Sequence, residues 1–152
     1  MVECAHAEGQ NTLGHVAVLR VALTSIYSYN EFVHPRYVVV FYRTLRGDSP
    51  PKDFIDSLEK RTRAKVLKWL DLLSEEGPAL PRPHADVVDG PIRELRVGFG
   101  HLEVRLLYFF HARTVIVVAH GFLKKTHAIP EQELRRAYRA HADWLLRNGG
   151  ST

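Results

Sequence analysis

Hydrophobic positions along the chain follow first a strand pattern and then a helix pattern. Residues 37–42 form a β-branched and aromatic run that is typical of a buried strand. Residues 50–76 then keep apolar side chains three and four positions apart, the spacing of an amphipathic helix that Ser49 would cap. Because about 25 residues is long for one helix, we expect a break near residues 59–62.

Three further strands and a last helix are predicted in the second half. The strands cover residues 93–97, 102–110 and 114–122, and a helix begins at Pro130 and ends before Gly149. Residues 78–90 contain three prolines and are predicted to be a stiff connector. The order β-α-α-β-β-β-α predicts an α+β fold, with a mostly antiparallel sheet covered by helices on one face.

The length of 152 residues fits one domain, which we place at residues 37–147. Residues 1–36 are interpreted as an N-terminal extension and residues 148–152 as a flexible tail. The longest apolar runs have strand length, so no membrane span is predicted. Cys4 is the single cysteine, which excludes an intrachain disulfide. We expect a cytoplasmic protein without a targeting signal.

Positive charge is concentrated in residues 91–125. This segment has six basic and two acidic residues, so its excess of +4 equals the formal net charge of the whole chain. Such a local excess is typical of an anion-binding surface, although a solvated sheet face would have the same composition.

Two arginines stand on predicted strands in this segment. Arg96 and Arg105 could converge on an oxyanion, because the guanidinium fork binds phosphate with two hydrogen bonds. The alternative is an internal ion pair of Arg105 with Glu94 or Glu103. The sequence has no phosphate-binding glycine loop and no helical pair of histidines at metal-ligand spacing, so neither a cofactor nor a metal is predicted.

The motifs in this half of the chain resemble the RelE/ParE toxin superfamily, and most closely its phage-derived HigB-like branch. They are Arg93-Glu94-Leu95-Arg96, Arg105-Leu106-Leu107-Tyr108-Phe109-Phe110 and His120-Gly121-Phe122-Leu123-Lys124-Lys125-Thr126, followed by a helix that opens with proline. The resemblance covers residues 37–147. It departs from the branch at Ile129, where a helix-capping threonine is common, and residues 1–36 have no counterpart.

The resemblance implies a RelE-like fold and the toxin of a type II toxin–antitoxin pair, an endoribonuclease that cuts mRNA on the ribosome without a metal or cofactor. The implied partners are a helix-turn-helix antitoxin, mRNA and the ribosome, whereas the oligomeric state is not specified. Two alternatives remain open. Relatives of the ParE type inhibit DNA gyrase without cutting RNA, and the chain could also be a basic binding domain without toxicity.

The resemblance also implies roles for individual side chains. We expect Arg96 and Arg105 to hold the scissile phosphate, Lys124 and Lys125 to clamp it or neutralise charge in the transition state, and His120 or His127 to transfer protons. Further contacts with RNA are assigned to Arg93, Arg113 and Phe122.

Overall fold

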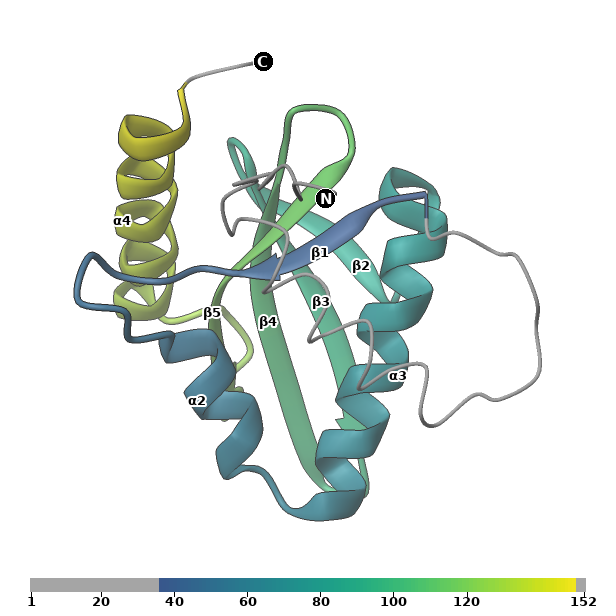
Figure 1. The fold of residues 1–152 in the computed structure, drawn as a ribbon. Helices are drawn as coiled ribbons and strands as arrows, with labels where there is room; N and C mark the ends of the chain where they lie inside the picture. Colours follow the sequence, from purple (N-terminus) through teal and green to yellow (C-terminus); the bar gives the residue numbers. More distant parts are fainter. Residues whose placement is uncertain (1–35, 150–152) are drawn as a thin grey trace, which may run out of the picture.

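The computed structural model describes residues 36–149 and has the α+β architecture predicted from the sequence (Figure 1). Most of the predicted extension and the end of the predicted tail lie outside the described residues. The elements in chain order are β1 (Val38–Phe41), α2 (Pro50–Ser57), α3 (Lys60–Glu76), a short 3-10 turn (Gly77–Ala79), β2 (Ala85–Asp89), β3 (Ile92–Phe99), β4 (Leu102–His111), β5 (Val115–Leu123) and α4 (Glu131–Asn148). No helix within residues 36–149 is long and apolar enough to cross a membrane.

The five strands form one sheet in the order β1-β5-β4-β3-β2. Strand β1 runs parallel to β5, and every other neighbouring pair is antiparallel. The predicted connector was wrong in part, because it contains β2, which pairs with β3 at the edge of the sheet. Its sequence Ala-Asp-Val-Val-Asp has little apolar alternation, and a register irregularity between Val87 and Asp89 shortens the regular pairing further.

Helices cover both faces of the sheet, which corrects the expectation of one covered face. Ile116 and Val118 of β5 pack in the cluster that also contains buried residues of α2 and α3. Val117 and Ala119 point the other way and pack with Ala137 and Ala140 of α4. Figure 1 shows α4 and α3 on opposite sides of the strands. A helical stripe in the sequence specifies one apolar side of a helix but not which sheet face receives it.

The long helical pattern is broken as predicted, but the break lies at Leu58 and Glu59, at the beginning of the expected range, and residues 60–62 already belong to α3. The expected cap was wrong in its chemistry. Ser49 precedes α2, but its hydroxyl makes no side-chain cap and instead donates a hydrogen bond to the carbonyl oxygen of Tyr42 at 2.8 Å. This buried hydroxyl therefore ties the end of the β1 segment to the start of α2.

Gly121 lets α2 approach β5 closely. A Cβ atom at this position would lie 2.3 Å from Cδ1 of Phe54 and 2.9 Å from Cδ2 of Leu106. Both distances are shorter than real Cβ contacts, so any larger side chain would displace α2 or β4. The glycine next to His120 in the His-Gly-Phe motif thus has a packing function.

We expect Gly121→Ala to lower the free energy of unfolding by about 1–3 kcal/mol, because the added methyl group overpacks the α2–β5 contact. Gly98→Ala is the matched control in another strand, where the new Cβ would lie 3.6 Å from Oε1 of Glu103, an ordinary contact. Urea unfolding followed by circular dichroism measures both changes. Equal stability of the two variants would contradict this account of the motif.

Candidate functional site

Four of the predicted site residues lie on the sheet face that α4 covers. Arg96 on β3 is the cross-strand partner of Arg105 on β4, and Arg105 is in turn the partner of Phe122 on β5. His120 is paired with Leu107, two positions further along β4, and therefore points to the same face. The meander brings residues from positions 96 to 122 into one row across three strands.

The two guanidinium groups converge on an oxyanion, and this oxyanion is the carboxylate of Glu94. Nε of Arg96 donates to Oε1 of Glu94 at 2.7 Å, and Nε of Arg105 lies 3.3 Å from Oε2. Glu94 is 4% exposed and Arg105 is 6% exposed, so this is a buried ion cluster. The internal ion pair considered from the sequence as the alternative for Arg105 is therefore present.

Each arginine has a second carboxylate partner closer to solvent. Nη2 of Arg96 lies 3.2 Å from Oδ2 of Asp86 on β2, and Nη1 of Arg105 donates to Oε2 of Glu103 at 2.9 Å. The hydrogen bond that Arg96 donates to Glu94 raises the pKa of Arg96 above its ordinary value. The exposed fraction of the Arg96 side chain is 32%, against 8% for Arg105, so only Arg96 is open to a ligand from solvent.

His120 is held between the sheet and the first turns of α4. Its Nε2 hydrogen-bonds to Oε2 of Glu133, which also pairs with Nη1 of Arg136 at 3.1 Å. Its ring stacks on Phe122 with the two centroids 6.1 Å apart. Burial lowers the pKa of His120, and the neighbouring Glu133 opposes this effect only in part. A neutral imidazole results near pH 7, and Nδ1 is free to accept a proton when Nε2 carries the hydrogen.

Lys124, Lys125 and His127 follow β5 directly. The backbone N–H of Lys124 donates to the carbonyl oxygen of Glu103 at 2.8 Å, which holds this segment against the start of β4. Lys125 and His127 are exposed, and Lys124 is half-buried. In the part of the chain that the structure describes, neither lysine forms an ion pair, so both ammonium groups are available to an anion.

Two residues assigned to RNA contact from the sequence lie away from this row. The guanidinium of Arg93 packs 5.1 Å from the ring centroid of Phe110, on the sheet face covered by α3. Arg113 is exposed in the turn between β4 and β5, at the end of β4 opposite Glu103. Between residues 36 and 149, no three histidine, cysteine or acidic side chains gather as metal ligands.

The sequence analysis missed a basic segment at the start of α3. The first nine residues of this helix contain five cations and no acid: Lys60, Arg61, Arg63, Lys65 and Lys68. The charge was summed over residues 37–77, where seven acidic residues offset it. Counting charge over each predicted helix separately would have found the segment.

Comparison with known proteins agrees with this arrangement of elements and motifs. The family described as "Phage derived protein Gp49-like (DUF891)" matches residues 53–141, more than half of the chain. The chain belongs to this Gp49-like family. It is also 39% identical over 74 residues to a Mycobacterium tuberculosis (strain ATCC 25618 / H37Rv) protein described as "Putative toxin HigB2". That match covers 45% of this chain and 37% of the relative. The resemblance to the HigB-like branch of the RelE superfamily is thus confirmed.

Replacing Glu94 tests whether its carboxylate is what keeps Arg105 buried. We expect Glu94→Gln to lower the free energy of unfolding by about 3 kcal/mol, because a buried guanidinium loses its charged partner. Glu103→Gln is the matched control; this carboxylate is 53% exposed, and its loss should cost less than about 1 kcal/mol. Urea denaturation of both variants measures the difference, and similar costs for the two would contradict a central role of Glu94.

Acidification should lower the stability of the Gp49-like domain through two histidines, His120 on β5 and His141 on α4. Burial lowers the pKa of both His120 and His141 below the ordinary value of 6.5. The unfolded chain therefore binds more protons as the pH falls through about 6.5, so stability is complete above this pH and declines below it. We expect a smaller free energy of unfolding at pH 5.5 than at pH 7.5, measured with urea.

The variant His141→Gln should reduce this pH dependence, because one of the two histidines no longer titrates. His101→Gln, in the exposed turn between β3 and β4, is the matched control. A stability profile that stays flat from pH 7.5 to 5.5 in the unmodified protein would refute the expectation.

Proposed function

We propose that this protein is the toxin of a type II toxin–antitoxin pair and acts as a metal-independent endoribonuclease on mRNA bound to the ribosome. Membership of the Gp49-like family and the similarity to a protein named as a toxin support the first part. The observation that carries the second part is the position of Lys124 and Lys125. Both ammonium groups are without carboxylate partners within residues 36–149 and follow directly on the strand of His120 and Phe122.

The chemistry needs no nucleophile from the protein. The 2′-OH of the nucleotide before the cut attacks the adjacent phosphorus, and the bond from phosphorus to the 5′ oxygen breaks. A base accepts the 2′ proton and an acid protonates the leaving oxygen, which yields a 2′,3′-cyclic phosphate and a 5′-OH end. Lys124 and Lys125 would stabilise the negative charge that grows on the phosphorane oxygens.

We assign proton transfer to two histidines, His120 as the base and His127 as the acid. Neutral His120 has an unoccupied Nδ1 and suits the base, whereas exposed His127 can approach the leaving group from solvent. Phe122 would stack on a base next to the cut.

Arg96 and Arg105 also take different roles in this proposal. Arg96 is the half-exposed member and would bind phosphate by exchanging Asp86 for it. Arg105 would stay with Glu94 and Glu103 and position Arg96 through the shared carboxylate. Arg93 and Arg113, which lie elsewhere, take no part in this proposed site.

The ion pairs of Arg105 with Glu94 and Glu103 favour a second candidate function. This candidate is a ParE-like toxin that binds DNA gyrase without cutting RNA. A guanidinium that is bound to two carboxylates is not preorganised for a phosphate. The proposed partners are otherwise those that the resemblance implies: a helix-turn-helix antitoxin, and mRNA on the ribosome in the cytoplasm.

Induction of the protein without its antitoxin, followed by mapping of transcript 5′ ends, tests the nuclease. We expect growth arrest and new 5′-OH ends within minutes, and the double variant Lys124→Gln/Lys125→Gln should cut at least about 100-fold less. Arg46→Gln/Arg139→Gln removes the same charge from exposed positions elsewhere and should cut normally. Growth arrest with intact transcripts and a DNA-damage response would favour gyrase, and normal growth would favour a binding domain without toxicity.

A further inference from the structure

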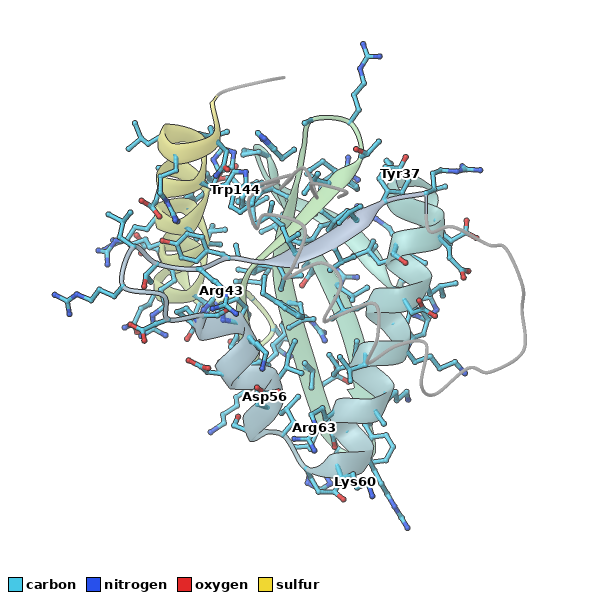
Figure 2. All side chains as sticks on the ribbon, viewed as in Figure 1. Tyr37, Arg43, Asp56, Lys60, Arg63 and Trp144 are labelled. Carbon is cyan, nitrogen blue, oxygen red and sulfur yellow. The ribbon has the colours of Figure 1, made fainter. Side chains whose placement is uncertain are left out.

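The start of α3 carries positive charge that the fold does not compensate. None of the five cations between Lys60 and Lys68 takes part in an ion pair within the described residues. The nearest intrachain partners are carbonyl groups: Nη1 of Arg63 donates to the carbonyl oxygen of Asp56 at 3.0 Å, and Nζ of Lys65 donates to that of Gly98 at 2.5 Å. Figure 2 shows Lys60 and Arg63 at the end of α3 opposite Tyr37.

This placement of charge lowers the stability of the helix. The first turn of a helix carries a partial positive charge, which favours acidic side chains and disfavours cations. The first turn of α3 has no acidic residue; the N-cap is Glu59, whose carboxylate forms no ion pair among the described residues. Arg61 and Lys65 are four residues apart and Lys65 and Lys68 three apart, so like charges also repel along the surface. Cations kept at such a position, without a partner in the fold, indicate an anion from outside the chain.

Four of the five cations lie on one face of the helix, and Arg63 lies outside it. At about 100° per residue, Lys60, Arg61, Lys65 and Lys68 fall within an arc of about 140°. The buried residues Thr62, Val66, Leu70 and Leu73 are centred on the opposite side, against the sheet. The row from Arg61 to Lys68 extends for about 10 Å along the helix axis, a length that matches at most about three successive phosphates of one strand.

An aromatic side chain lies beside these cations of α3. Nζ of Lys65 lies 5.5 Å from the ring centroid of Phe99, which is half-exposed at the end of β3, and exposed His101 follows in the same turn. Cations beside an aromatic ring are the combination by which proteins hold nucleic acid backbones and stack bases. An acidic protein partner would instead need apolar anchors. The exposed large aliphatic residues of the described chain are Leu45, Val87, Leu123 and Leu146, and none lies on α3 or in this turn.

We propose that Lys60, Arg61, Lys65 and Lys68 of α3, together with Phe99, form an RNA-docking surface that is separate from the strand-end site at Lys124 and Lys125. The choice of RNA as the polyanion rests on the function proposed above. This surface holds the sugar–phosphate backbone of RNA outside the cut and supplies affinity without sequence preference.

Binding is measured by fluorescence anisotropy with the purified full chain and a fluorescein-labelled 20-nucleotide RNA carrying 2′-O-methyl groups throughout. This probe lacks the attacking 2′-OH and cannot be cut, so binding is measured independently of cleavage. The triple variant Lys60→Gln/Arg61→Gln/Lys68→Gln should bind about 10- to 100-fold more weakly at 0.1 M KCl. The slope of log K against log [KCl] should become about 2 less steep, since each lost phosphate contact contributes about 0.7.

Two controls separate the docking surface from general charge and from folding. Arg36→Gln/Arg46→Gln/Arg139→Gln removes the same charge from other exposed positions and should change the Kd less than about 3-fold. Lys60→Arg/Lys68→Arg keeps the charge and should bind as the unmodified chain does. Thermal unfolding of the glutamine triple variant on α3 should occur at the same temperature or a few degrees higher, because repulsion is removed.

Four outcomes would overturn the inference. Equal losses in the two glutamine triple variants would indicate diffuse attraction, and unchanged binding in the α3 variant would remove the surface altogether. A lower unfolding temperature of the α3 variant would indicate a structural role. Loss of binding to a deca-glutamate peptide with intact RNA binding would point to an acidic protein. An unmodified chain that binds RNA through α3 but cuts no transcript would refute only the proposed nuclease.

Discussion

The buried carboxylate of Glu94 is the interaction on which the centre of this structure depends. A guanidinium at 6% exposure in the middle strand of a sheet is tolerable only when an opposite charge replaces the water it has lost. Glu94 lies on the neighbouring strand β3 and contacts both Arg96 and Arg105. The register of β3 against β4 is thereby fixed from inside the sheet, because a slip by one residue would turn Glu94 to the α3 face.

This ion cluster also divides the α4 side of the sheet into an apolar part and a charged part. Ile92, Leu107 and Phe109 carry the apolar packing under α4, whereas Arg96 and Arg105 continue the same face toward the β3–β4 turn. The side chains of His120 and Phe122 lie at the border between these two regions. The His120 side chain is 12% exposed at this border, and burial accordingly lowers its pKa.

Much of the fold follows from local sequence patterns, and the rest depends on contacts that such patterns do not encode. The central strands and the three helices were predictable because their apolar spacing is strong. Strand β2 was missed because Asp86 and Asp89 interrupt its pattern and pairing to β3 alone defines it. For Arg105 the sequence left two readings open, an oxyanion from outside or an internal ion pair with Glu94 or Glu103. Only the cross-strand register, which places Glu94 beside Arg105, decides for the ion pair.

The cations of this chain divide into two classes with different physical meaning. Arg96, Arg105 and Arg136 have carboxylate partners, and their removal would leave a buried or half-buried anion without its counterion. Lys124, Lys125 and the cations at the start of α3 have none within residues 36–149. Net charge per segment cannot distinguish the two classes, because a compensated and an uncompensated arginine count equally. Cations that have no carboxylate partner in the described fold are therefore better evidence for an external polyanion than the overall excess of +4.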